Sequence, residues 1–176
     1  MNRKKLIAIR IILIALTLTV MTVIFLLSAD DADESNMKSD FLADSFFYTF
    51  LADFDLTDEE IEVILGKCVM VIRNTAHFAE YGALGFLAAS VGISFYVKPK
   101  INIPVSFAFS ALYAVSDEIH QYFVPGRSCQ ITDIFIDSAG ALCGAVMIVG
   151  IVLLYNKRRI NNNLAELNYC KVIGKK

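Results

Sequence analysis

The chain has 176 residues, 56% of them hydrophobic, and a formal net charge of −2. Because an ordinary soluble domain is only about 45–50% apolar, the mean hydropathy of +0.57 indicates a membrane protein. Basic residues form no stripe outside the short ends, which argues against a nucleic-acid partner. Neither a repeat nor a flexible linker divides the chain, so we expect one domain over residues 1–176.

The first apolar run extends from Leu6 to Leu27. At ~1.5 Å per residue it is long enough to cross a hydrocarbon core of about 30 Å. The alternative is a signal peptide, since residues 3–5 are basic, but the apolar run exceeds the usual ~7–15 residues and Ser28-Ala29-Asp30 is a poor cleavage site. We therefore predict an uncleaved membrane anchor.

An acidic segment follows, residues 28–67, which holds most of the Asp and Glu residues of the chain. Its apolar residues are spaced to give a short helix one aromatic-rich face, suited to lying along a membrane surface or to packing on the other helices. They are Phe41, Leu42, Phe46, Phe47, Phe50 and Leu51. Thr57 and Glu60 form a capping-box pattern, which predicts that a new helix begins near Asp58 and continues into the membrane.

Three further spans are predicted at residues 69–96, 103–122 and 131–155. Turn signals separate them, at Lys98-Pro99-Lys100 and at Pro125-Gly126-Arg127. With the first span they predict an all-α fold: a membrane four-helix bundle with a short interfacial helical segment between spans one and two.

Basic residues indicate the orientation of this bundle, because cytoplasmic loops are enriched in Lys and Arg. The acidic segment 28–67 and the loop at residues 123–130 would then lie outside, and both termini in the cytoplasm. The basic residues that point to one side are Arg3, Lys4, Lys5, Lys98, Lys100, Lys157, Arg158 and Arg159.

Polar and ionisable residues interrupt three of the four spans, where a charge costs on the order of a few kcal/mol at the bilayer centre. They are Arg73, His77, Glu80 and Tyr81 in the second span, Tyr113, Asp117, Glu118, His120 and Gln121 in the third, and Asp133 and Asp137 in the fourth. Helical spacing places Asp117, His120 and Gln121 on one face, with Glu118 pointing elsewhere.

The topology places all three polar clusters in the outer half of the membrane, so we expect them to form one pocket. Gly140 and Gly144 give the fourth span a small-residue face that permits close helix packing, and Gly82 and Gly85 offer the same on the second. The alternative is that the polar residues only pair with one another and hold the bundle together.

Three sequence elements closely resemble the VanZ-like family of bacterial membrane proteins. They are Ile72-Arg73-Asn74-Thr75-Ala76-His77-Phe78-Ala79-Glu80-Tyr81-Gly82-Ala83-Leu84-Gly85, Asp117-Glu118-Ile119-His120-Gln121-Tyr122-Phe123-Val124-Pro125-Gly126-Arg127, and Asp133, Asp137, Gly140 and Gly144, a motif core over residues 72–144. The resemblance implies a multi-pass protein of the bacterial plasma membrane and cell envelope, in a family named for a member that raises resistance to teicoplanin. The family usually has a Ser-Ser-Gln-like element after the first span, where this chain has Ser28-Ala29-Asp30.

The preferred functional hypothesis is binding of an envelope lipid or glycopeptide, with a contribution to glycopeptide antibiotic resistance; membrane lipids are the expected partners. The binding residues would be Arg73, Tyr81, Gln121, Arg127 and Asp133. The alternative is an intramembrane hydrolase or transferase that acts on a lipid-linked envelope substrate. Its candidate catalytic residues are His77, Glu80, Asp117, His120 and Asp137.

A divalent metal is not required by either hypothesis. If one is bound, its ligands would be His77, His120, Asp133 and Asp137. Movement of protons or ions ranks last, because no matching relay of ionisable residues occurs in the inner half. The cysteines show no metal-ligand spacing, and an approach of Cys68 to Cys129 at one membrane face is a minor alternative.

Overall fold

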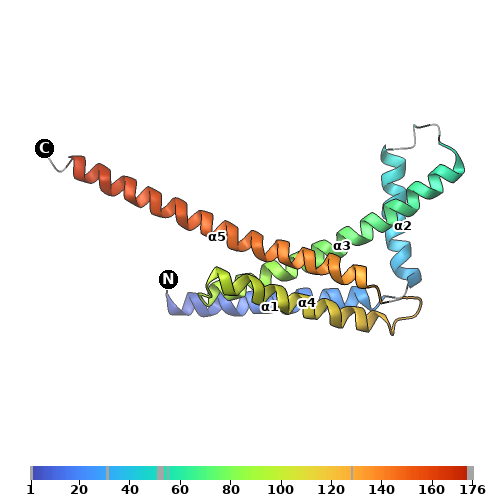
Figure 1. The fold of residues 1–176 in the computed structure, drawn as a ribbon, viewed down its shortest axis with the longest axis horizontal. Helices are drawn as coiled ribbons and strands as arrows, with labels where there is room; N and C mark the ends of the chain where they lie inside the picture. The colour runs from blue at the N-terminus through green and yellow to red at the C-terminus, as the bar shows by residue number, and fades with distance from the viewer. Residues whose placement is uncertain (1, 31, 51–53, 55, 128, 174–176) are drawn as a thin grey trace.

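The computed structural model describes residues 2–30, 32–50, 54, 56–127 and 129–173. The described part of the chain folds into helices without a strand, which confirms the all-α prediction (Figure 1). The helices are α1 (Arg3–Ser28), α2 (Ala32–Phe50), α3 (Asp58–Ser94), α4 (Pro99–Gln121) and α5 (Ile131–Ile173).

Local sequence signals account for where these helices begin and end. The capping box predicted at the start of α3 is present: the Thr57 side chain accepts the backbone N–H of Glu60, and the Glu60 carboxylate accepts the backbone N–H of Thr57. Pro99 lies in the first turn of α4, where no backbone donor is needed. Gly126, in the loop before α5, has a φ of 73°, a conformation that glycine adopts without steric cost.

The central element is α3, which packs against each of the other four helices. The N-terminus and the far end of α5 lie toward one end of the bundle, and the α1–α2 link and the α4–α5 loop lie at the other (Figure 1). Three elements that are far apart in sequence therefore meet at this second end: the end of α1, the middle of α3 and the loop before α5.

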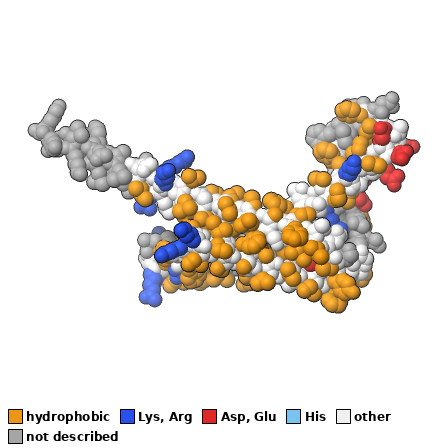
Figure 2. Space-filling model, viewed as in Figure 1, with side chains coloured by type: hydrophobic (Ala, Val, Ile, Leu, Met, Phe, Trp, Pro, Cys, Tyr) orange, Lys and Arg blue, Asp and Glu red, His pale blue; other side chains and the backbone are white. Residues whose placement is uncertain are grey.

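Small residues fill the interior and large apolar residues cover the outside. Buried positions include Gly85, Ala89, Ala114, Gly140, Ala141, Gly144 and Ala145. Outward-facing side chains more than half exposed include Ile11 (62%), Val105 (59%), Leu112 (71%) and Leu154 (63%). Figure 2 shows hydrophobic side chains spread over the visible face of the bundle, with Lys, Arg, Asp and Glu side chains mainly at its two ends. Such a surface suits lipid rather than water.

Glycines bring α3 and α5 into backbone contact, which confirms the close approach predicted from the small-residue face. A methyl group added at Gly144 would overlap the carbonyl oxygen of Gly82, and one at Gly140 would overlap the carbonyl oxygen of Phe78. Gly85 meets the backbone of α5 in the same way. The two helices can cross this closely only because these positions carry no side chain.

Two helices among the described residues are long and apolar enough to cross a membrane, namely α1 and the Ile131–Asn161 part of α5. The prediction of four spans is therefore confirmed for only two of them. The predicted second and third spans do correspond to α3 and α4, but ionisable residues interrupt their apolar stretches. The helix predicted to end near residue 155 continues to Ile173.

Candidate functional site

A polar cavity of about 170 Å³ lies where the end of α1, the middle of α3 and the α4–α5 loop meet, with Ser39 and Leu42 of α2 at its side. Four residues predicted for the site line it together: Arg73, His77, Glu80 and Arg127. Ser28 and Asp30, at the end of α1, complete the polar lining. The cavity thus combines two guanidinium groups with carboxylates and an imidazole.

Arg127 reaches this cavity from the loop between α4 and α5. Its Nη1 donates to Oε1 of Gln121 at 3.1 Å and its Nη2 to the carbonyl oxygen of Leu27 at 3.2 Å. Its Nε is buried and has no hydrogen-bond partner among the described residues. Burial lowers the pKa of the Arg127 guanidinium from its ordinary value, and the positive charge of Arg73 lowers this pKa further. The negative charges of Asp30, Asp117 and Glu118 act on this pKa in the opposite direction, so Arg127 interacts with carboxylates as well as with a like charge.

A buried hydrogen-bond network joins α1 to α4 beneath Arg127. Ser28 donates its hydroxyl to Oδ2 of Asp117 at 2.7 Å, and Nε2 of Gln121 donates to the same oxygen at 3.2 Å. The Asp117 side chain is only 3% exposed. Sequence reasoning missed Ser28 as a site residue, although a hydroxyl that ends an otherwise apolar helix was the available signal.

His77 faces Asp137 across the contact between α3 and α5, with 3.3 Å between Nδ1 and Oδ1. The glycine contact sets this geometry, because Phe78 follows His77 and touches Gly140, one turn after Asp137. Asp137 is fully buried, and neither of its carboxylate oxygens has an aligned hydrogen-bond partner among the described residues. The pair is at ion-pair distance, so a proton on the imidazole would be stabilised by the carboxylate.

Tyr81 is fully buried beside this pair, with its ring 6.3 Å from that of Tyr113. The Tyr113 hydroxyl donates to the backbone carbonyl of Met21 at 2.6 Å, which ties α4 to α1. Asp133, in the first turn of α5, is 7% exposed. Tyr81, Tyr113 and Asp133 are not among the described residues that line the polar cavity.

Glu118 points away from Asp117, as its helical phase predicts. Its Oε2 accepts the backbone N–H of Gln130 at 2.8 Å, immediately before α5. A carboxylate at this position interacts favourably with the positive end of the α5 dipole. Glu118 therefore helps to position the loop that carries Arg127.

His120 is not among the described residues that line the cavity. Its ring stacks on Phe25 of α1 with centroids 4.5 Å apart. Among the residues that the structure describes, no three His, Cys, Asp or Glu side chains are grouped so as to hold a metal ion. His77 lines the polar cavity and lies next to Asp137, whereas His120 stacks on Phe25, and Cys68 and Cys129 are free thiols.

Comparison with models of protein families identifies the family of this chain. The family model described as VanZ/LLP1 matches residues 13–154, which is most of the chain. The chain belongs to the VanZ/LLP1 family. No curated protein and no solved structure matches the chain in the corresponding comparisons. The family match includes α2, α3, α4 and residues 131–154 of α5, and so contains all of the described residues that line the polar cavity of this VanZ/LLP1 protein.

Proposed function

We propose that this VanZ/LLP1 protein is a multi-pass protein of the bacterial plasma membrane that binds an anionic envelope lipid in its polar cavity. In this proposal α1, α3, α4 and α5 all cross the membrane, both termini are cytoplasmic, and the cavity opens near the outer leaflet. By family relationship, a contribution to glycopeptide resistance is part of the proposal, either through the bound lipid or through direct binding of the glycopeptide.

The composition of α4 alone does not identify it as a membrane span. The distribution of its side chains nevertheless supports a membrane location. Val105, Leu112 and Ile119 recur at seven-residue intervals and are 59%, 71% and 55% exposed. Ser106 and Ser110, on the opposite side, are buried. A helix that turns large apolar residues outward and small polar residues inward is typical of a helix surrounded by lipid.

Charge distribution supports the orientation. Lys and Arg side chains gather at the end of the bundle that carries the N-terminus, and Asp and Glu side chains at the opposite end (Figure 2). Because Lys and Arg are enriched on the cytoplasmic side, the basic end belongs inside and the cavity outside.

The observation that carries the binding proposal is the pair of arginines at the cavity. Arg127 is held by Gln121 and by the carbonyl of Leu27, while its buried Nε lacks a described partner. Such a group needs an acceptor, since an unsatisfied buried donor costs about 1–3 kcal/mol. A lipid phosphate that reaches Arg73 and Arg127 would supply acceptor oxygens to both guanidinium groups and add a negative charge to the carboxylates of Asp30 and Glu80 that share the cavity.

Lipid retention tests this proposal directly. The protein is purified in mild detergent, and co-purified lipids are extracted, identified by mass spectrometry and counted per protein. Arg127→Gln and Arg73→Gln should each lower retention of the phosphate-bearing lipid about tenfold or more, because a charge-assisted hydrogen bond contributes ~1.5–3 kcal/mol.

Arg10→Gln is the matched control, because Arg10 binds the carbonyl of Ser94 at the other end of the bundle. It should leave retention in the cavity unchanged. Equal lipid content in the wild type and in both cavity variants would contradict the binding proposal. Teicoplanin sensitivity of cells that express each variant then measures the contribution to resistance.

The His77–Asp137 pair favours a second candidate, an intramembrane hydrolase or transferase that acts on a lipid-linked substrate. A buried carboxylate that orients an imidazole is the usual arrangement for a general acid or base. Incubation of the purified protein with lipid-linked phosphate substrates tests it. Turnover that is lost in His77→Ala but kept in His120→Ala would support it, and the absence of turnover in the wild type would contradict it.

A further inference from the structure

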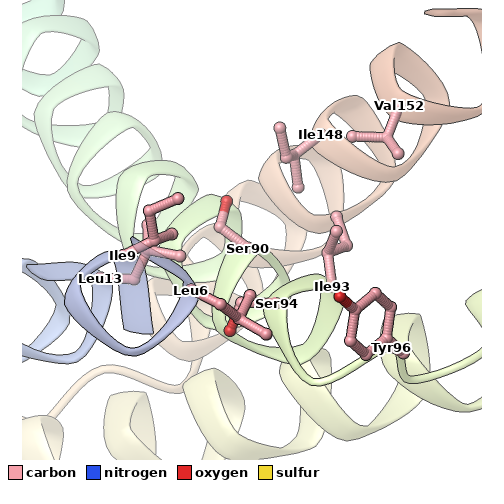
Figure 3. A pocket seen from close by; sticks show the side chains of 9 residues that line it. All are labelled: Leu6, Ile9, Leu13, Ser90, Ile93, Ser94, Tyr96, Ile148 and Val152. Atoms are coloured by element: carbon pink, nitrogen blue, oxygen red, sulfur yellow. The ribbon is translucent and has the colours of Figure 1, made fainter. Parts of the chain in front are cut away.

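A second cavity, of about 360 Å³, lies at the basic end of the bundle (Figure 3). Its floor is the last part of α3, and its walls are α1 and α5, which pack against α3 on either side. Leu6, Ile9 and Leu13 come from one wall, and Ile148 and Val152 from the other. We refer to this cavity as the inner groove.

Three polar side chains line the inner groove, those of Ser90, Ser94 and the 73% exposed Tyr96, and both serines are already satisfied by the protein. The hydroxyl of Ser90 donates to the carbonyl of Phe86 at 2.7 Å, and that of Ser94 to the carbonyl of Val91 at 2.7 Å. The carbonyl of Ser94 in turn accepts from Nε and Nη2 of Arg10, at 3.1 and 2.9 Å. The groove therefore presents an apolar surface to any ligand, and a hydrocarbon chain is the chemistry that fits it.

The mouth of the groove is positively charged. Residues 1–29, 81–116 and 138–165, which contain this end of the bundle, include no Asp or Glu. Arg3 lies one turn before Leu6 on α1, and Arg159 lies two turns beyond Val152 on α5. Both arginines are exposed. An apolar groove that ends in cations is complementary to an anionic amphiphile.

We propose that the inner groove binds one hydrocarbon chain of an anionic phospholipid of the cytoplasmic leaflet, with the phosphate at Arg3 and Arg159. The volume of about 360 Å³ accommodates about ten methylene groups if each takes ~30 Å³, the share of one water molecule in the liquid. This site lies at the opposite end from the polar cavity. It depends on the membrane crossing of α1 and α5 but not on what the polar cavity binds.

Native mass spectrometry of the full chain in detergent tests the proposal, with phosphatidylglycerol and phosphatidylcholine of identical acyl chains as probes. The wild-type groove and the groove variants are each compared in an Arg127→Gln background, so that lipid in the polar cavity does not contribute. This background should retain phosphatidylglycerol several-fold better than phosphatidylcholine. Ile148→Trp, which fills the groove without a change of charge, should lower phosphatidylglycerol binding about tenfold, since each displaced methylene loses ~0.8 kcal/mol of burial. Leu154→Trp is the matched control, because Leu154 is 63% exposed on the same helix and does not line the groove.

Ile9→Trp, from the opposite wall, repeats the test in case Ile148→Trp fails to elute as a single folded species. Arg3→Gln should remove most of the preference for phosphatidylglycerol over phosphatidylcholine, whereas Lys100→Gln, on α4, should retain it. Equal loss in Leu154→Trp and in the groove variants would overturn the proposal, as would equal binding of the two lipids by Arg127→Gln. Lipid loss confined to Arg127→Gln, with no further loss in the groove variants, would assign the bound lipid to the polar cavity and would also overturn it.

Discussion

Gly144 lies at the contact that holds α3 and α5 together, and Gly144→Ala perturbs that contact by a single methyl group. The added carbon would overlap the carbonyl oxygen of Gly82 and lie 2.9 Å from the backbone nitrogen of Phe86. Both neighbours are backbone atoms, so no rotation of a side chain relieves the overlap. The two helices must separate, and the His77–Asp137 pair, which bridges the same helices, must lengthen.

The size of the effect follows from two opposing terms. Overpacking a close helix contact costs about 1–3 kcal/mol. Replacement of glycine by alanine within a helix stabilises it by ~0.5–1 kcal/mol. Gly150→Ala in the same helix provides the second term alone, because nothing lies within 4 Å of a methyl group there. Because the helix gain is common to both variants, we expect Gly144→Ala to be less stable than Gly150→Ala by the overpacking cost, about 1–3 kcal/mol.

Reversible unfolding in detergent micelles, followed by circular dichroism, measures this difference. The lipid-retention assay on the same samples shows whether the polar cavity is altered together with stability. If Gly144→Ala is as stable as Gly150→Ala, the backbone contact between α3 and α5 does not exist as described. If it is unstable yet retains lipid like the wild type, the contact does not position the cavity.

Two further predictions concern polar contacts. Ser28→Ala should lower stability by about 1.5–3 kcal/mol, because the Asp117 carboxylate loses a buried donor. Ser116→Ala should have no measurable effect, because the exposed Ser116 hydroxyl bonds only within its own helix. Equal effects of the two substitutions in the same unfolding assay would refute the buried network. Hydrogen bonds from the backbone and side chain of Thr57 lower the pKa of Glu60 below its ordinary value of 4.5, so their stabilisation is present above pH 4.5 and is lost as the pH falls through the lowered pKa. The protection factors of amide hydrogens in the first turn of α3, which correct for the intrinsic pH dependence of exchange, should therefore fall on acidification in the wild type and less so in Thr57→Ala. An identical pH dependence of the protection factors would count against the capping box.

Large apolar side chains cover the outside of the bundle, whereas small and polar residues form its interior. Because lipid offers no hydrophobic driving force for helix association, the bundle relies on backbone proximity at Gly140 and Gly144 and on buried polar links such as Ser28–Asp117. The same links define the polar cavity. Substitutions that loosen packing and substitutions that remove ligand contacts should therefore both reduce lipid retention, and stability measurements are needed to separate them.

The sequence by itself determined the helices and their polar faces. Apolar run length and the turn signals at Pro99 and Pro125 marked the elements, the Thr57 pattern marked the start of α3, and glycine spacing predicted its contact with α5. These features depend on interactions between residues that are near in sequence, or on a missing side chain, and both can be read from one helix at a time.

Only the tertiary structure decided which faces meet. Helical phase placed His120 with Asp117 and Gln121, and all three face α1, but the His120 ring stacks on Phe25 whereas the other two meet Ser28. Ser28, the last residue of α1, reaches the site only because α1 packs beside α4. Spacing along one helix defines a face but not its neighbour, because the rotation and crossing of helices depend on how all of their side chains pack at once.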